Sequence, residues 1–416
     1  MLQDPPFRLR SLVPSVYAPT LLYSIGLGLL LPVVPLFAKD LGAAVGLVGL
    51  TVAMRGVGTM AGDVPWGMAV TRFGAKRAMV IGTAGTAVVA ILTGLASDIG
   101  QLIALMFLNG AVWSLFSIAQ LTFMADGVPI EHRGRAISLV GGVNRAGLLV
   151  GPVAGGLIAS AFGLEAVFFV QAAISVATLV LLASWVPDAG RRVVEAGGGH
   201  AHTRLGQTLS VHRRTFLTAG VAAVTLVLIR NARQVLIPLW GDSIGLDVAE
   251  IGLVFGVASA VDTMLFYPAG IVMDRRGRKW TSVPSMLALS GSLALVPLTG
   301  SFASFMMVGL LSGFGNGLGS GAVMTLGADL APRDRTGEFL GVWRLITDSG
   351  SVAGPVAIGA LAQALTLAAA ALVTAGVGLA GAAVMLFLAA ETLRRPERAL
   401  AASHADDSPD GGAAAG

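Results

Sequence analysis

Twelve long apolar stretches, separated by short segments that hold charged residues, glycine or proline, dominate this sequence. Each has roughly 20 to 27 residues, which lets an α-helix cross about 30 Å of hydrocarbon. The pattern therefore predicts an all-α membrane protein with twelve transmembrane helices. The predicted spans are 13–37, 45–70, 78–96, 101–125, 136–161, 165–187, 215–240, 248–273, 281–300, 303–328, 337–363 and 367–390.

The longest polar stretch divides these spans into two sets of six. It contains three consecutive glycines and, nearby, the histidines His200, His202 and His212. These histidines could bind a metal, but a solvated linker fits the composition better, and we expect no metal site. The predicted domains are an N-terminal six-helix bundle at 1–187, a cytoplasmic linker at 188–214, a C-terminal six-helix bundle at 215–390 and a disordered cytoplasmic tail at 391–416.

Composition and charge agree with a membrane protein. Charged residues make up 12% of the chain, against about 25% in soluble domains. The absence of cysteine excludes disulfides, thiolate metal sites and cysteine nucleophiles. Of the 27 lysines and arginines, only Lys39 lies in a loop on the side opposite the N-terminus, and five lie inside spans. This asymmetry predicts that both termini are cytoplasmic, and it explains the basic charge without a nucleic-acid partner.

The two halves of the chain match each other at a constant separation of 203 residues. The matching pairs are 67–76 with 270–279, 125–129 with 328–332, 147–152 with 350–355, and Pro35 with Pro238. Chance seldom gives four ungapped coincidences, so we infer a duplication and two pseudo-symmetric six-helix bundles. Parallel repeats of this kind place a substrate site between the halves, near the midplane of the membrane.

Two of these matching segments have distinctive residues. Glycines and a proline within an apolar run indicate a bent helix that packs closely against a neighbour, as at Gly147, Gly151, Pro152, Gly155 and Gly156. The second segment combines glycines, one acid and a row of cations at Gly270, Asp274, Arg275, Gly277, Arg278 and Lys279, and its first-half copy keeps Gly67, Arg72 and Gly74. A carboxylate at the end of its helix, such as Asp274, can cap a neighbouring helix or pair with cations across the halves, and so stabilise one conformation.

With the twelve spans, these segments resemble the major facilitator superfamily over essentially the whole chain. The segment 270–279 is similar to the signature loop of that family, and 147–156 is similar to the fifth-helix motif of its drug:proton antiporter branch. Two departures stand out. Thr71 and Ala75 replace an acid and a base in the first signature loop, and the fourth span carries Asn109 and Gly110 without the arginine that precedes this position in the branch.

Eight ionisable residues lie inside the predicted spans away from the span ends, and each costs at least about 2.5 kcal/mol near the bilayer centre if it is unpaired. Arg145 and Asp262 are both near the midplane, about 15 to 18 Å from the helix ends. The resemblance places the fifth helix beside the eighth and the second beside the eleventh. We therefore predict that Arg145 faces Asp262 and that Arg55 and Asp63 face Arg344 and Asp348, as a proton-coupling and charge network. The alternatives are a static network, or a pair between Arg344 and Asp348 within one helix.

Arg230 and Arg233 lie three residues apart on one face of the seventh span, with no acid within one turn. They indicate an anionic ligand, partners on another helix, or snorkelling towards the outer interface. The resemblance places the first, fourth, seventh and tenth helices around a cavity. Their polar and aromatic residues are candidates for substrate contact or for helix packing: Tyr23, Asn109, Trp113, Gln120, Asn231, Trp240 and Asn316.

These observations favour a secondary active transporter that moves a small amphipathic solute by alternating access, with protons as the coupling ion and no other cofactor. The resemblance implies efflux, as in multidrug resistance. The alternatives are an organic-anion or metabolite carrier that uses Arg230 and Arg233, and a non-transporting membrane sensor. No P-loop or nucleophile–base set indicates an enzyme. We expect a monomer in the plasma (inner) membrane, with the lipid bilayer and a small-molecule substrate as its partners.

Overall fold

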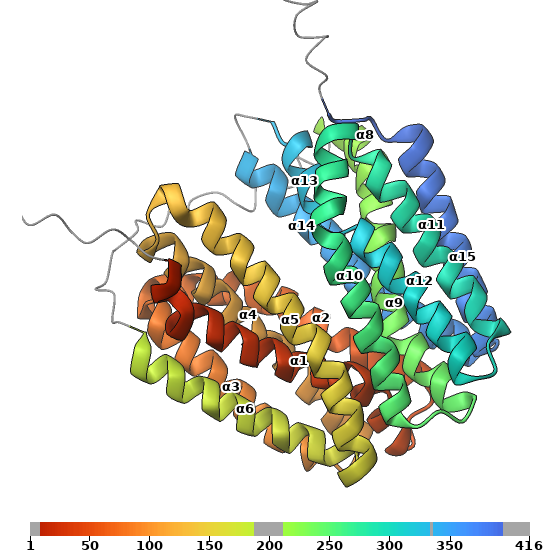
Figure 1. Cartoon of the computed structure of the whole chain (residues 1–416), viewed down its shortest axis with the longest axis horizontal. Coiled ribbons are helices and arrows are strands. Elements are labelled where there is room, and N and C mark those ends of the chain that lie inside the picture. Colours follow the sequence, from red (N-terminus) through yellow and green to blue (C-terminus); the bar gives the residue numbers. More distant parts are fainter. Residues whose placement is uncertain (1–8, 187–210, 333–335, 394–416) are drawn as a thin grey trace, which may run out of the picture.

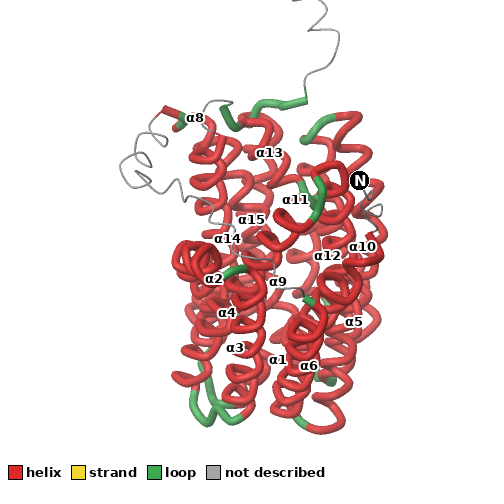
Figure 2. The backbone as a smooth tube through the Cα atoms, turned by 90° about the vertical axis from the view of Figure 1, so that its left-hand side faces the viewer, coloured by secondary structure: helices red, strands yellow, loops and turns green. Residues whose placement is uncertain are grey.

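The computed structural model describes residues 9–186, 211–332 and 336–393. Within these residues, twelve helices are long and apolar enough to cross a membrane, and no strand occurs. Figure 2 shows this arrangement of long helices joined by short loops. The predicted all-α fold with twelve spans is therefore confirmed. Most of the predicted linker and tail lies outside the described residues, and the domain boundaries stay a prediction.

The first half begins with two short turns and continues with six long helices. These are Leu9–Leu12 and Val13–Tyr17, followed by α1 (Ala18–Asp40), α2 (Val45–Phe73), α3 (Ala75–Gly94), α4 (Ile99–Gly127), α5 (Ile130–Phe162) and α6 (Leu164–Trp185).

The second half repeats this order. Its elements are α8 (Arg213–Thr215), a turn at Phe216–Gly220, α9 (Val221–Ser243), α10 (Val248–Arg276), α11 (Lys279–Leu295) with a turn at Val296–Leu298, α12 (Phe302–Leu318), α13 (Ala322–Leu330), α14 (Thr336–Ala364) and α15 (Leu367–Ala383) with a turn at Val384–Leu388. Helices α1 and α9 have the same length and begin 203 residues apart, which is the separation found in the sequence.

The two bundles contact each other mainly through three pairs of helices, α1 with α9, α2 with α14, and α5 with α10. We call the helix ends beside Arg72 and Arg275 the basic ends, and the other ends the opposite ends. In Figure 1 the ribbons of the two bundles converge at the opposite ends and diverge towards the basic ends.

Glycines at matching positions of the two halves form close backbone contacts between the bundles. Gly49 of α2 packs on Gly359 of α14, and Gly252 of α10 packs on Gly156 of α5. A Cβ atom at Gly49 would overlap the Pro355 carbonyl oxygen, and one at Gly252 would overlap that of Pro152. Because only glycine leaves the room for such backbone contact, the duplicated sequence forms two equivalent helix crossings at the opposite ends.

The tenth span is broken, although the apolar pattern at 303–328 is continuous. Helix α12 ends at Leu318 and α13 begins at Ala322, with Gly321 at a φ of +80° between them. In the first half, the positions that match Gly319 and Gly321 are Phe116 and Ile118, and α4 runs through them unbroken. Several glycines close together weaken the helix, so the break occurs in the second half alone.

Candidate transport site between the halves

Arg145 of α5 and Asp262 of α10 form an ion pair between the two halves. The Nη1 atom of Arg145 lies 3.0 Å from Oδ1 of Asp262, and its guanidinium group lies 4.2 Å from the centre of the Phe266 ring. The side chains are 21% and 15% exposed, so the pair is largely removed from solvent. The predicted contact is confirmed, while its role in transport stays a prediction.

The break in the tenth span supplies two further donors to Asp262. Asn316 Nδ2, in the last turn of α12, donates to Oδ2 at 2.8 Å, and the Ser320 hydroxyl donates to Oδ1 at 3.1 Å. Ser320 also donates to the carbonyl oxygen of Asn316. Asp262 therefore joins α5, α10 and the broken span. Unwound backbone within a membrane is tolerated where it is buried in protein or lines a site.

Arg230 and Arg233 of α9 lie beside this cluster. Arg233 donates to the Ser312 hydroxyl of α12 at 2.9 Å and to the carbonyl oxygen of Arg230 at 3.1 Å. The Nε and Nη2 atoms of Arg230 are buried and have no hydrogen-bond partner among the described residues. The charged groups near Arg230 are Arg233, Asp262 and Arg145. These contacts lie inside the protein, so they do not correspond to snorkelling towards the membrane surface.

A second network joins α2 to α14, the interface that matches α5 and α10. Asp63 lies 3.3 Å from Arg344, and Arg344 lies 3.4 Å from Asp348 on its own helix. Ser114 of α4 donates to the other oxygen of Asp63. The predicted contacts among these three ionisable residues are confirmed, and the pair within one helix exists beside the pair between helices.

Arg55 lies outside this network, so its predicted position was wrong. Eight residues separate Arg55 from Asp63, which turns the side chain by about 80° around the helix. Its guanidinium group lies 6.0 Å from the centre of the Trp113 ring, and its buried Nε has no partner among the described residues.

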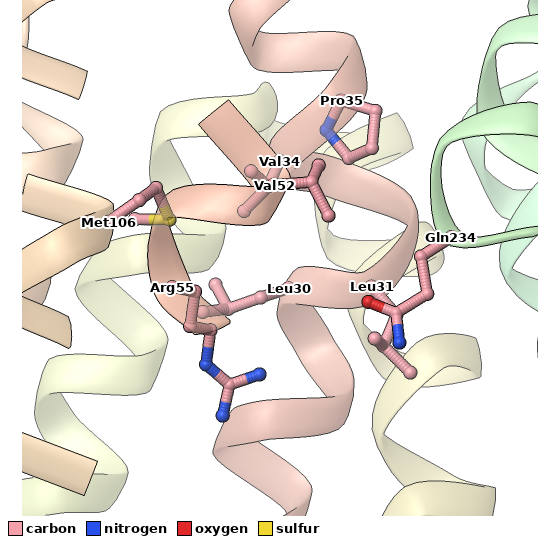
Figure 3. A pocket seen from close by; sticks show the side chains of 8 residues that line it. All are labelled: Leu30, Leu31, Val34, Pro35, Val52, Arg55, Met106 and Gln234. Atoms are coloured by element: carbon pink, nitrogen blue, oxygen red, sulfur yellow. The ribbon is translucent and has the colours of Figure 1, made fainter. Parts of the chain in front are cut away.

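Arg55 lines a cavity of about 40 Å³ where α1, α2, α4 and α9 meet (Figure 3). The lining residues are Leu30, Leu31, Val34, Pro35, Val52, Arg55, Met106 and Gln234. Binding pockets for drug-sized molecules have about 300 to 1,000 Å³. This cavity therefore has room for water rather than for a solute.

The other candidate lining residues make contacts within the bundles. The Tyr23 hydroxyl bonds to that of Thr86 at 2.8 Å, its ring stacks on Phe116, and Asn109 is buried. Gln120 donates to Thr20, Trp240 donates to Thr299, and Asn231 bonds to its own helix. Of the candidates, the structure brings Asn316 to the Asp262 cluster and Trp113 near Arg55. Whether any of them touches a solute stays a prediction.

In the second signature loop, Arg278 rather than Asp274 makes most of the contacts. Arg278 donates to Asp329 at 2.8 Å, to Asp274 at 3.2 Å and to the carbonyl oxygen of Met273. These contacts lie within the second half, and Asp274 has no ion pair across the halves among the described residues. The hydrogen bond to Asp329 is the largest cause of a raised pKa of Arg278; partial burial opposes the rise, and the charges of Asp329 and Asp274 add to it.

Glu391, which the sequence reasoning did not single out, caps helix α11. Its carboxylate accepts hydrogen bonds from the backbone N–H groups of Arg278 and Lys279, at 2.9 and 3.1 Å. Partial burial acts to raise its pKa, but backbone donors, with Arg278 and Lys279 first, bring this pKa below its usual value. The predicted capping of a helix by an acid thus occurs, but a residue 117 positions after Asp274 performs it.

Gly74 and Gly277, at matching positions of the two signature loops, have φ angles of +86° and +118°. Each ends one transmembrane helix and precedes the next, so glycine is favoured at this tight turn. Gly67 and Gly270 face open space. Arg72 and Arg275 are exposed, and Thr71 bonds to its own helix, so the first loop lacks the ion pairs of the second within the described residues.

The fifth-helix motif packs against two helices. Gly147, Gly151 and Gly155 of α5 pack against α1, and a Cβ atom at any of these glycines would overlap Ser24, Gly28 or Leu29 of α1. Gly156 of α5 packs against α10 in the other half. The close helix packing predicted from these glycines is confirmed.

A third ion pair crosses the halves at the opposite ends, between Lys39 of α1 and Asp242 of α9. These residues are 203 positions apart, so the pair joins matching positions of the two repeats. The repeat spacing marks the two positions as equivalent, and equivalent residues meet only where they lie close to the pseudo-twofold axis.

The comparisons with known proteins agree with this geometry. The model of the Major Facilitator Superfamily matches residues 18–230 and 219–409. The multidrug resistance protein MdtG of Citrobacter koseri is 25% identical over 385 residues, which cover 90% of this chain and 93% of that protein. MdtG of Escherichia coli O81 is 24% identical over 386 residues, which cover 90% of this chain and 93% of that protein.

Solved structures show the same fold at low sequence identity. A mutant of the nucleoside transporter NupG superposes with a TM-score of 0.73 at 12% identity, covering 89% of this chain and 98% of that protein. A bacterial homologue of the human lysosomal transporter Spinster, inward-facing and unoccupied, has a TM-score of 0.73 at 14% identity, covering 93% of this chain and 96% of that protein.

Proposed function

This chain is a member of the major facilitator superfamily, and from that premise we propose that it exports a small amphipathic solute by alternating access, driven by protons. It is a multi-pass membrane transporter and not an enzyme. Export is supported by the relatives at 24–25% identity that are named multidrug resistance proteins. The largely apolar faces of the spans, with a few polar groups gathered at the interface, suit a solute with an apolar body and one polar end.

The observation that carries the proposal is the pair of charge networks that cross between the halves inside the spans. Arg145 with Asp262 and Asp63 with Arg344 occupy the two matching interfaces, α5 with α10 and α2 with α14. The bundles diverge from these interfaces towards the basic ends (Figure 1). A rocking motion of one bundle against the other changes the distances within both networks, so charge and conformation are coupled there.

The α2–α14 network has the charge balance of a proton site. Asp63 and Asp348 share Arg344, so the three ionised groups together carry one excess negative charge. The side chains of Asp63, Asp348 and Arg344 are 27%, 40% and 63% exposed, so they are not enclosed within the protein. A proton on Asp63 neutralises the network and removes the charge that holds Arg344 across the interface. The helices α2 and α14 can then separate.

The basic residues set the orientation that we propose. Cytoplasmic loops of membrane proteins carry an excess of arginine and lysine, so the basic ends lie in the cytoplasm, with both termini. This conformation then offers its solute site to the cytoplasm, which is the state that collects a solute for export.

The test is proton movement in proteoliposomes that contain the purified protein and a pH-sensitive dye. Cationic, neutral and anionic aromatic solutes are added in turn. At least one is expected to drive a proton flux, and Asp63→Asn or Asp348→Asn should abolish it. Asp40→Asn is the matched control, because this exposed carboxylate lies outside both networks. An unchanged flux in both network variants would contradict the proton role. No flux with any solute would contradict transport and favour the membrane sensor.

A further inference from the structure

We propose that the polar end of the solute is an organic anion, a carboxylate, sulfonate or phosphonate group, and that it binds among Arg145, Arg230 and Arg233 beside the break in the tenth span. This inference rests on the proposed transport function and specifies its substrate class. Three observations carry it: the charge balance of the cluster, its unused donors and its surroundings.

The charge balance is opposite to that of the α2–α14 network. Among the described residues, Arg145 pairs with the single carboxylate of Asp262, and the guanidinium groups of Arg230 and Arg233 lie within its electrostatic range. The other polar partners, Ser312, Asn316 and Ser320, are neutral. Two positive charges therefore remain uncompensated in a medium of low dielectric constant, where unpaired charge is costly. An anion reduces this cost, and a cation increases it.

The cluster also has hydrogen-bonding capacity that the protein does not use. Nε and Nη2 of Arg230 have no partner among the described residues. They belong to the planar donor fork that matches the two oxygens of an oxyanion. Nη2 lies 3.0 Å from the place where a Cβ atom at Gly319 would stand, so the glycine of the helix break leaves the room for this guanidinium group.

The surroundings suit an amphipathic anion that enters from the side of Arg145. The Arg145 side chain is 21% exposed, while the unused atoms of Arg230 are enclosed. The Phe266 ring lies 4.2 Å from the Arg145 guanidinium group and supplies an apolar surface for the body of the solute. The anion thus meets Arg145 first, and it reaches the enclosed Nε and Nη2 atoms of Arg230 when the side chains around them move apart. The proton site on α2 and α14 is a separate site, so proton and anion influence each other through the conformation of the two bundles.

The test uses two probes of the same shape and opposite charge, naphthalene-2-sulfonate and 2-naphthyl-trimethylammonium. Binding to the full-length protein in lipid nanodiscs is measured by titration calorimetry. We expect the sulfonate to bind at least about tenfold more tightly than the ammonium, and Arg230→Gln or Arg233→Gln to weaken sulfonate binding by about tenfold. Arg230→Lys, which keeps the charge and loses the fork, should weaken it less. Arg55→Gln is the matched control, a membrane arginine with an unpartnered Nε outside the cluster, and should leave the affinity unchanged.

Several outcomes would overturn the anion site: no sulfonate binding, preference for the ammonium, or equal losses in Arg55→Gln and Arg233→Gln. A thermal unfolding scan accompanies each variant, and Arg230→Lys and Arg233→Gln serve as the test if Arg230→Gln does not fold. The proton-flux assay is independent of this measurement. Sulfonate binding without any solute flux would support the anion site and contradict the transport function, whereas flux of cations alone would do the reverse.

Discussion

Arg145 and Asp262 show, at the scale of single residues, how buried charge depends on its partner. Each has a partner on another bundle, and Asp262 accepts three hydrogen bonds from side chains. Removal of one partner leaves the other charged in an environment that solvates it poorly. Arg55, whose Nε has no partner among the described residues, likewise needs compensation for its charge, and the small cavity and the Trp113 ring lie beside it.

The pair can be tested by reversing its charges. Arg145→Asp or Asp262→Arg alone should destabilise the protein by about 3 kcal/mol, because each removes the ion pair, and Asp262→Arg also adds a fourth guanidinium group to the cluster. The double variant should recover part of this loss, measured by thermal unfolding of the purified protein. Asp274→Asn, which removes a carboxylate that is 72% exposed, should cost about 1 kcal/mol or less. A double variant no more stable than either single one would show that the pair does not act as a unit.

At the scale of helices, glycines decide how closely the two bundles approach. Gly49 and Gly252 lie at matching positions of α2 and α10 and contact α14 and α5 through backbone atoms. The same helices also carry Gly67 and Gly270, around which nothing lies within 4 Å. The two kinds of glycine have equal helix propensity and differ only in their surroundings, so the chain contains its own matched controls.

Gly49→Ala or Gly252→Ala should weaken the closure at the opposite ends, whereas Gly67→Ala and Gly270→Ala should not. The chain has no cysteine, so a reporter pair can be introduced at Gly46 and Gln363, whose backbone N–H and side-chain oxygen lie 3.3 Å apart across the halves. Disulfide formation between these two cysteines should be rapid in the parent protein and at least about fivefold slower after Gly49→Ala, since an added Cβ separates the helices. Equal rates in the Gly49→Ala and Gly67→Ala backgrounds would contradict this interpretation.

At the scale of the whole molecule, the duplication places matching residues at the pseudo-twofold axis. Lys39 and Asp242 are such residues, and they pair with each other where the bundles converge. The pair is partly exposed, so its attraction is screened by salt. An exposed pair adds at most about 1 kcal/mol to the stability of the fold, and we expect its main effect on the balance between conformations.

Lys39→Asp should open the opposite ends, because it places two carboxylates at the axis. The exchange Lys39→Asp with Asp242→Lys should restore closure, since the pseudo-symmetry makes the two positions equivalent. Spin labels on α1 and α9 would report the separation of the bundles as a distance distribution. A distribution that is unchanged in Lys39→Asp, at low as well as high salt, would exclude this role for the pair.

Sequence alone determined the properties that depend on local pattern and on repetition. Span number follows from the length of apolar runs, because an isolated backbone in lipid must be helical. The pairing of α5 with α10 and of α2 with α14 followed from the family resemblance, and the contact of Arg145 with Asp262 from their equal depth. Glycine spacing indicated close packing, although it did not say which glycine faces which helix.

Tertiary structure decided which neighbour each side chain meets. Arg55 and Asp63 belong to the same helix, but their side chains point about 80° apart around its axis and therefore contact different neighbours. Glycines in the tenth span allow the break at 319–321, but its contact with Asp262, through Asn316 and Ser320, comes from another helix. Glu391 reaches Arg278 and Lys279 because α15 ends beside the start of α11. Such contacts join residues far apart in the chain, and their geometry is set by the packing of whole helices rather than by any local pattern.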